Sequence, residues 1–316
     1  MKKIINQQAI RDHYQQAGLW SSIRKAFNRT GREIKDYTDT ESFDEFHIRG
    51  REATRELARF SGLAKGMKVL DLGCGVGGPA RVLAAEFGCN VTGIDLLEEY
   101  CEAATMLTEH TGWSHKVNFQ QGDMTRLAFE DQTFDVVWTL HTIMNIEDKT
   151  KLFDSVFRIP KPGGRFALYE ICAGANVPPY FPVPWAGDAS MSFLLSPDDL
   201  RGRMKKSGFE ERQWQDASHA SIKWFQAIAK IRAASGGKSG RHSGKISGNK
   251  SGGEAPGEKG SRPGISLLMG RTAAEKSKNV FRNLTEDRIR TVFGVFRKPE
   301  NQDVETRMLK NDAHVD

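Results

Sequence analysis

The stretch Val69-Leu70-Asp71-Leu72-Gly73-Cys74-Gly75-Val76-Gly77-Gly78 decides the fold. Its apolar first half belongs to a predicted strand over residues 67–72, and the closely spaced glycines predict a sharp turn against which a ligand can lie. Residues 79–87 are then predicted to form a helix whose first N–H groups face the turn. A strand, a glycine turn and a helix in this order are typical of the ligand-binding edge of an open α/β sheet.

Strands and helices alternate along most of the remaining chain. Besides the helix at 79–87, helices are predicted at 98–111 and 147–159, and a further one begins after Ser196 with proline and acidic residues in its first turn. This alternation predicts a parallel sheet with helices on both faces, that is, a doubly wound α/β fold. The predicted strands cover residues 67–72, 90–96, 117–121, 134–140, 165–170 (after the turn at 161–164), 209–213 and 288–298.

Most of the positive charge lies in one segment. The chain has 316 residues and a formal net charge of +6, and residues 231–263 contain seven Lys or Arg and two Glu, so the remainder is close to neutral. Residues 233–263 are rich in Gly, Ser and Lys and poor in apolar residues, which predicts a disordered linker inserted in the fold. A tether for anionic partners is the alternative, but nucleic acid is an unlikely partner because no aromatic residues are interleaved with the charges.

Composition places the chain among soluble proteins. Hydrophobic residues make up 38% and charged residues 27%. No stretch approaches the roughly 20 apolar residues of a membrane helix, and the N-terminus lacks the apolar core of a secretion signal. The four cysteines have no Cys-x-x-Cys pair and no metal-ligand spacing. We therefore expect a cytoplasmic protein with free thiols, no bound metal and no membrane insertion.

The order of these features predicts a domain organisation. We expect an N-terminal helical cap at residues 1–42, a main domain formed by 43–232 together with 264–298, the linker at 233–263, and a polar tail at 299–316. The strand at 288–298 follows the linker. We assign it to the main sheet because the sheet would be incomplete without this last strand. The oligomeric state is not predicted.

Two acidic residues follow the next two predicted strands. Asp95 ends the second strand, where a carboxylate can accept hydrogen bonds from both hydroxyls of a ribose. Asp123, in Gly122-Asp123-Met124, follows the third strand and can reach an adenine amino group. The glycine spacing, Asp-x-Gly-x-Gly-x-Gly-Gly, differs from the Gly-x-Gly-x-x-Gly of dinucleotide-binding domains.

Taken together, these motifs resemble the class I S-adenosylmethionine-dependent methyltransferases over residues 43–232 and 264–298. The resemblance implies a Rossmann-like sheet of seven strands, mostly parallel, with an antiparallel last strand at 288–298. It also implies S-adenosylmethionine as the cofactor, with its amino end near Asp71, its ribose at Asp95 and its adenine at Asp123 and Met124. The other cofactor-binding residues that it implies are Gly73, Gly75, Gly77, Gly78, Leu96, Gly122 and Leu140.

Three segments, residues 43–54, 140–146 and 177–186, are expected to cover the methyl acceptor. They contain Asp-Glu-Phe-His-x-x-Gly, His-Thr-x-Met-Asn-Ile and a proline- and aromatic-rich lid ending in Pro-Trp-Ala. These sequences are similar to the sarcosine/dimethylglycine N-methyltransferases and their ubiquinone/menaquinone-type relatives. The resemblance favours N-methylation of a small amine or amino acid such as sarcosine or dimethylglycine.

Two other functions stay open. A C- or O-methyltransferase of a quinone, phenolic or polyketide ring would have an all-apolar pocket, whereas an amino acid needs a cation to hold its carboxylate. An RNA-binding protein or adaptor acting through the basic linker is the alternative from another class.

The acceptor segments contain several candidate site residues. His141 is the candidate catalytic base for an amine or hydroxyl acceptor, although it could equally be a neutral wall residue. His47 and Asn145 are candidate substrate contacts; a turn role is the alternative for Asn145. Each role is an expectation from position alone.

Charged and aromatic residues supply further substrate candidates. Arg49 or its neighbour Arg51 could pair with a substrate carboxylate, or could be solvated. Tyr180 and Trp185 could hold an ammonium group by cation–π contact, or could simply pack the lid.

Overall fold

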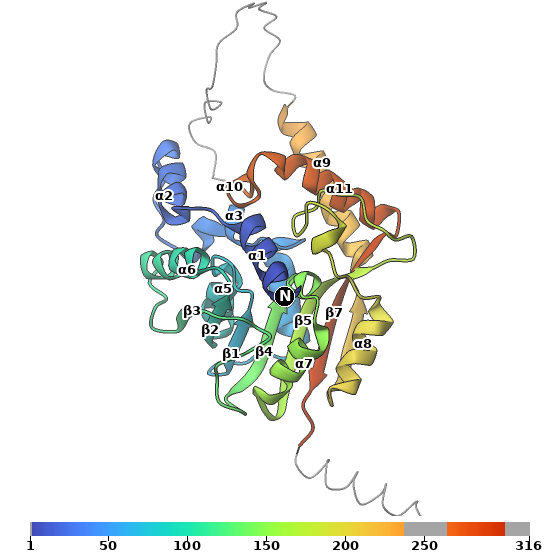
Figure 1. The fold of residues 1–316 in the computed structure, drawn as a ribbon. Coiled ribbons are helices and arrows are strands. Elements are labelled where there is room, and N and C mark those ends of the chain that lie inside the picture. The colour runs from blue at the N-terminus through green and yellow to red at the C-terminus, as the bar shows by residue number, and fades with distance from the viewer. Residues whose placement is uncertain (1, 237–263, 301–316) are drawn as a thin grey trace, which may run out of the picture.

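A seven-stranded sheet forms the centre of the protein (Figure 1). The structure is a computed structural model that describes residues 2–236 and 264–300. The strand order is β3-β2-β1-β4-β5-β7-β6. The strands are β1 (Lys68–Leu72), β2 (Asn90–Asp95), β3 (Val117–Gln121), β4 (Phe134–Leu140), β5 (Pro160–Ala173), β6 (Glu210–Asp216) and β7 (Ile289–Arg297).

One strand runs against all the others. β1 pairs in parallel with β2 and β4, β2 with β3, and β4 with β5. β7 lies between β5 and β6 and is antiparallel to both. The expected doubly wound sheet with an antiparallel last strand is therefore confirmed.

Helices cover both faces of the sheet because successive side chains of a strand point to opposite faces. Val69 of β1 belongs to the apolar cluster that contains residues of α4 and α5. Leu70, the next residue, belongs to the cluster formed with α7 and α8. The helices of these layers are α4 (Gly50–Phe60), α5 (Gly78–Phe87), α6 (Glu98–His110), α7 (Lys149–Arg158) and α8 (Pro197–Lys206).

A further helical layer lies above the carboxyl ends of the parallel strands (Figure 1). It combines both ends of the chain, α1 and α2 before the sheet and α9 to α11 just before β7. No helix was predicted from the sequence between residues 218 and 285, because the Gly/Ser/Lys segment at 233–263 interrupts the alternation of strands and helices. The remaining elements are α1 (Lys2–Tyr14), α2 (Leu19–Thr30), η1 (Tyr37–Thr40), α3 (Glu41–Asp44), η2 (Ile143–Asn145), η3 (Ala189–Met191), α9 (Ser218–Gly236), α10 (Ser266–Met269), η4 (Gly270–Thr272) and α11 (Ala273–Thr285).

Several predicted boundaries differ from the observed ones. β5 already begins at Pro160, just before the predicted turn at 161–164, and its register against β4 shifts between Phe134 and Val136. β6 continues to Asp216 because it pairs with β7 along its whole length. Helix α9 runs to Gly236, four residues into the predicted linker. The remainder of that linker, and the predicted tail beyond residue 300, lie outside the described residues.

Within the described ranges, no helix is both long and apolar enough to cross a membrane.

Candidate active site

A cavity of about 1240 Å³ lies between the sheet and the upper helical layer. Polar residues from the ends of β1, β2 and β3 line its inner end, and mainly apolar residues of α1, α9, α10 and α11 line its outer part. Its volume exceeds the roughly 300–1,000 Å³ of an ordinary small-molecule site. There is room for more than one ligand.

The glycine turn forms part of the inner wall. Gly73 and Gly75 line the cavity and have φ angles of +73° and +53°, which favour glycine. A Cβ on Gly75 would have no atom within 4 Å, whereas one on Gly73 would overlap the Thr142 side chain. The main chain at Gly75 is therefore open to a ligand.

Gly77 and Gly78 serve a different purpose from the one predicted. Neither lines the cavity. A Cβ on Gly77 would overlap the ring of Phe119, and one on Gly78 would overlap the main chain of Asp44. These glycines let α5 pack closely against its neighbours, so they support the turn from behind and do not face the cavity.

Asp71 supplies an unusual carboxylate at the inner end. It is 2% exposed, and its Oδ2 has no hydrogen-bond partner among the described residues. Burial, and then the nearby charge of Asp95, raise the pKa of Asp71 to about 7. A cationic group entering the cavity would relieve this unfavourable burial.

Asp95 lies at the end of β2 and lines the cavity. Its Oδ2 accepts a hydrogen bond from the N–H of Gly75, and its Oδ1 accepts one from the N–H of Leu97, both at 3.0 Å. Burial raises the pKa of Asp95, while these hydrogen bonds oppose the rise. Each oxygen keeps a second lone pair with which to accept a ligand hydroxyl.

Asp123 also lines the cavity, but its oxygens are already engaged. Oδ1 accepts bonds from the N–H and hydroxyl of Thr125, both at 2.8 Å, and Oδ2 accepts one from Nε2 of Gln7 at 2.7 Å. Gln7 belongs to α1, so this bond ties the N-terminal helix to the inner end of the cavity. Four other predicted cofactor residues line the same region, namely Leu96, Gly122, Met124 and Leu140.

His141 follows β4 and lines the cavity. Its Nδ1 donates a hydrogen bond to the carbonyl oxygen of Tyr169 at 3.0 Å, and its buried Nε2 has no partner within the described structure. Burial, and then the neighbouring His47, lower the pKa of His141 to about 3. The ring is therefore neutral at physiological pH and keeps a free lone pair on Nε2.

His47 lines the cavity near His141, with the two ring centroids 6.1 Å apart. Its Nε2 donates to the carbonyl oxygen of Gly50 at 2.8 Å and lies 3.1 Å from the Thr54 hydroxyl. Burial lowers the pKa of His47 to about 4. This second imidazole is also neutral, and its hydrogen bonds hold the segment that precedes α4.

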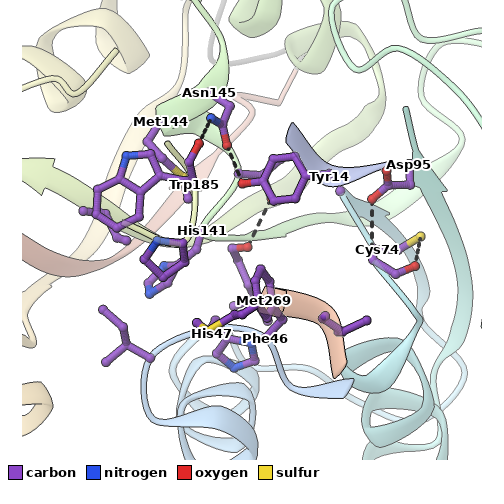
Figure 2. Close-up of a pocket in the computed structure, with 18 of the residues that line it drawn as sticks. Tyr14, Phe46, His47, Cys74, Asp95, His141, Met144, Asn145, Trp185 and Met269 are labelled. Carbon is purple, nitrogen blue, oxygen red and sulfur yellow. Dashed lines mark hydrogen bonds between the residues drawn. The ribbon is translucent and has the colours of Figure 1, made fainter. Parts of the chain in front are cut away.

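Asn145 joins three parts of the upper wall (Figure 2). Its Nδ2 donates to the carbonyl oxygens of Trp185 at 2.8 Å and Met191 at 3.1 Å, and its Oδ1 accepts from the Tyr14 hydroxyl at 3.0 Å. Both amide protons are thus used within the protein. The predicted substrate contact lines the cavity, but its bonds serve to hold the lid.

The two candidate arginines do not reach the cavity. Arg49 pairs with Glu52 at 2.7 Å and with Glu56 at 2.5 Å. Arg51 pairs with Glu41 at 3.2 Å and with Glu45 at 3.5 Å. Both are nearly buried, so the prediction of solvated arginines is wrong, and the prediction that Arg49 meets a substrate is also not supported.

The two predicted lid aromatics, Tyr180 and Trp185, lie in different environments. The Tyr180 ring lies under the guanidinium groups of Arg282 and Arg288, at 3.6 and 4.1 Å from its centroid, and does not line the cavity. Tyr180 was predicted to hold an ammonium group of the substrate, but its ring contacts the protein's own arginines instead. Trp185 is 1% exposed, lines the cavity and donates from Nε1 to Ser192 at 3.0 Å.

Many residues of the outer part were not predicted as site residues. Figure 2 shows Tyr14 between Asp95 and Cys74 on one side and Trp185, Met144 and His141 on the other. Phe46, Ile48 and Met144 lie in segments 43–54 and 140–146, which were predicted to cover the acceptor. Membership of these segments was the only signal in the sequence that could have identified them. The others come from the upper helices and include Ile10, Tyr14, Trp224, Phe225, Ile228, Leu268, Met269, Val280 and Phe281.

Comparison with known proteins identifies the central part of the chain. Residues 70–168 match the family described as "Methyltransferase domain". A sterol 24-C-methyltransferase of Aspergillus fumigatus is 41% identical over 114 residues, which cover 36% of this chain and 30% of that enzyme. Phosphoethanolamine N-methyltransferase 1 of Arabidopsis thaliana is 37% identical over 129 residues, or 41% of this chain and 26% of that enzyme. The matched region thus spans about a third or less of these relatives.

A solved structure extends the likeness to nearly the whole fold. A putative sarcosine dimethylglycine methyltransferase from Galdieria sulphuraria superposes with a TM-score of 0.59 at 17% identity, covering 89% of this chain and 99% of that one. Residues 70–168 therefore match a methyltransferase domain, and most of the chain shares its fold with the solved methyltransferase. The glycine turn, Asp71 and Asp95 lie together at the inner end of the cavity.

Proposed function

We propose that this protein transfers the methyl group of S-adenosylmethionine to a bulky, lipophilic small molecule. The observation that supports this acceptor class best is the apolar outer part of the cavity. Aromatic and aliphatic side chains from α1, α9, α10 and α11 enclose it, and no arginine of the described residues lines it. Such walls bind an apolar acceptor through the hydrophobic effect.

The charged residues at the cavity are consistent with this acceptor. Arg49 and Arg51, which could have held the carboxylate of an amino acid, are engaged in ion pairs outside it. Three lysines, Lys151, Lys230 and Lys278, are among the lining residues, but all three are exposed. They therefore belong to the mouth of the cavity, where water weakens any contact with a substrate anion.

The inner end fits the cofactor. The unpartnered oxygen of Asp71 is suited to the ammonium group of the methionine part, and the free lone pairs of Asp95 to the ribose hydroxyls. The open main chain at Gly75 leaves room between them. When bound, the cofactor supplies a methyl group already activated on a sulfonium, so the protein mainly has to align the acceptor and exclude water.

His141 is suited to remove the proton that an acceptor loses. Its free Nε2 lone pair lies at the cavity wall, and its Nδ1–H is fixed on the carbonyl of Tyr169. A base whose pKa is lowered to about 3 takes a proton efficiently only from a group that becomes strongly acidic as it is methylated. A carbon or ring acceptor meets this condition better than a protonated amine does.

N-methylation of a small amine or amino acid is the second candidate. The identity with the phosphoethanolamine N-methyltransferase and the His-Thr-x-Met-Asn-Ile and Pro-Trp-Ala motifs support it. Trp185 and Tyr14 at the cavity wall could hold an ammonium product by cation–π contact. This candidate lacks a cation in the cavity interior for a substrate carboxylate.

A panel of possible methyl acceptors, each assayed separately, distinguishes the two candidate functions. The full-length protein is incubated with methyl-labelled cofactor and, separately, with sterols, isoprenoid alcohols, quinols, phenols, sarcosine, dimethylglycine and phosphoethanolamine. We expect label in a lipophilic product and none in the amines. Label in the amines alone would replace the first candidate by the second, and label in no product would overturn the proposed activity toward these classes.

A further inference from the structure

The turn that follows β4 has a backbone conformation that needs support. His141 has a φ of +50°, in the left-handed region that non-glycine residues seldom adopt. This conformation is unfavourable for a residue with a Cβ unless its surroundings hold it in place. The same turn continues into η2, which carries Met144 and Asn145 of the cavity wall. Small changes in this turn would therefore move both the imidazole and the wall.

A buried carboxylate holds the start of the turn. Glu170 lies on β5 beside the end of β4 and is 1% exposed. One of its oxygens, Oε1, accepts hydrogen bonds from two successive N–H groups, those of Thr142 at 3.0 Å and Ile143 at 3.1 Å. These are the first N–H groups after His141, which would otherwise be buried without partners. Glu170 does not line the cavity.

A buried ammonium group holds the other end. Lys149 is 4% exposed, and its Nζ donates to the carbonyl oxygens of Ile143 and Phe193, both at 2.8 Å, and also to that of Ile146. Three donated bonds use all three protons of an ammonium group. The negative group thus meets the N–H end of η2 and the positive group meets its carbonyl end, as the dipole of a helical turn favours.

The imidazole of His141 takes its orientation from this turn. Its main-chain N–H donates to the carbonyl oxygen of Tyr169 at 2.8 Å, and its Nδ1 donates to the same oxygen at 3.0 Å. Both bonds are formed with the backbone of residue 141 in its left-handed conformation. They leave Nε2 as the free nitrogen at the cavity.

We propose that Glu170 and Lys149 are positioning residues that grip the turn at its two ends and so present Nε2 of His141 to the cavity. The use of Nε2 as a base rests on the proposed function, but the grip on the turn does not. Neither residue touches the cavity, so both act on the reaction only through His141 and η2. Neither residue forms a side-chain hydrogen bond with the glycine turn, Asp71 or Asp95 in the described structure.

The protonation of the two groups follows from their bonds. Burial raises the pKa of Glu170 to about 7 and lowers the pKa of Lys149 to about 7. The N–H groups of Thr142 and Ile143 oppose the first shift, and the charge of Glu170 opposes the second. Nζ of Lys149 donates three hydrogen bonds and Oε1 of Glu170 accepts two, which favours the charged form of each residue.

Nitrogen NMR of the full-length protein labelled at histidine tests this arrangement without an acceptor. The His141 signal is assigned by its loss in His141→Gln. We expect the wild type to show an Nδ1-protonated ring with an unprotonated Nε2. Glu170→Gln keeps an oxygen for both N–H groups and puts its NH₂ where Oε2 has no partner, so we expect the same tautomer. Glu170→Leu and Lys149→Met remove the side-chain hydrogen bonds to the turn, and we expect loss of the single-tautomer signal.

A matched control separates positioning from general destabilisation. Val156→Ala shortens a fully buried side chain of α7 in the core on one face of the sheet and removes none of the hydrogen bonds of the turn. We expect it to lower stability and leave the His141 signal unchanged. If Glu170→Leu does not fold, Lys149→Met alone decides. The proposal is overturned if the folded Glu170→Leu or Lys149→Met variant keeps the wild-type tautomer, or if Val156→Ala loses it as well.

The NMR result and the proposed activity can fail independently. A fixed tautomer that depends on Glu170 in a protein that methylates none of the test compounds would keep the positioning role and remove the methyltransferase proposal. Once an acceptor is known, Glu170→Leu should lower kcat at unchanged cofactor affinity, because the side chain of Glu170 is hydrogen-bonded to Thr142 and Ile143 and not to a predicted cofactor residue of the described structure.

Discussion

The hydroxyl of Tyr14 donates a hydrogen bond to Oδ1 of Asn145 over 3.0 Å and so joins helix α1 to the turn after β4, 131 residues along the chain. Burial raises the pKa of the Tyr14 phenol well above its usual value, so the group remains a donor at any working pH. Through Asn145 the bond continues to the main chain at Trp185 and Met191. These contacts hold the N-terminal helix and the proline-rich lid to the same wall of the cavity.

This relationship predicts unequal effects of two substitutions. Tyr14→Phe removes one hydrogen bond and should lower the free energy of unfolding by about 1 kcal/mol. Asn145→Ala also leaves the carbonyl oxygens of Trp185 and Met191 without this donor and should cost about 2–3 kcal/mol. Urea unfolding of both variants measures the difference. Equal costs would show that the lid does not depend on Asn145.

The open main chain at Gly75 predicts a selective loss of cofactor affinity. Gly75→Ala puts a methyl group into the cavity and should weaken binding of adenosylhomocysteine by about tenfold or more, or ~1.4 kcal/mol. Gly112→Ala is the matched control, since Gly112 also has a positive φ and open space for a Cβ, but lies outside the cavity. Both should lose similar stability from backbone strain. A similar loss of affinity in both would remove Gly75 from the site.

Asp71 predicts opposite effects on binding and on stability. Its folded pKa of about 7 is raised above the ordinary value of 3.8, so the folded form binds the extra proton and stability falls as pH rises between these values. Asp71→Asn should therefore stabilise the cofactor-free protein at pH 8 by about 1–3 kcal/mol and flatten that pH dependence. It should also weaken cofactor binding, because a neutral amide accepts a hydrogen bond from an ammonium group but forms no ion pair with it. Thermal unfolding and calorimetry at pH 5 and pH 8 test both; a destabilised Asp71→Asn at pH 8 would contradict the assignment.

His141 predicts an unusual pH profile. Because its pKa is lowered to about 3, the ring stays neutral down to about pH 4, and its protonation should not reduce the rate between pH 8 and pH 5. An ordinary histidine would lose activity near pH 6.5. His141→Ala should lower kcat by about 10²-fold with unchanged cofactor affinity. The rate is followed with whichever acceptor the labelled-methyl assay identifies, and wild-type turnover in His141→Ala would exclude the base.

The sequence was sufficient to predict the sheet and the inner half of the site because both depend on local signals. The run from Val69 to Gly78 identifies its own strand, turn and helix, and Asp95 and Asp123 follow strands whose parallel ends must meet. The roles of Gly77 and Gly78 were not predictable in this way. Whether a glycine faces a ligand or a neighbouring helix depends on the packing of Phe119 and Asp44, which are distant in sequence.

The acceptor half was not predictable for a related reason. Its walls come from α1, which precedes the sheet, and from α9, α10 and α11, which precede the last strand where it returns between β5 and β6. Arg49 has the position expected of a substrate contact, but the positive φ at its own residue starts α4 and turns its side chain toward Glu52 and Glu56. Such pairings depend on tertiary structure, and no pattern of residue types identifies them.

We predict a nucleoside site at the inner end of the cavity, built from the glycine turn, Asp71 and Asp95. Calorimetric titration of adenosylhomocysteine into the wild type, Asp95→Ala and Gly112→Ala tests it most directly. We predict one binding site per chain, with wild-type affinity in Gly112→Ala and at least tenfold weaker binding in Asp95→Ala. No binding by the folded wild type, or equal affinity in all three proteins, would contradict it.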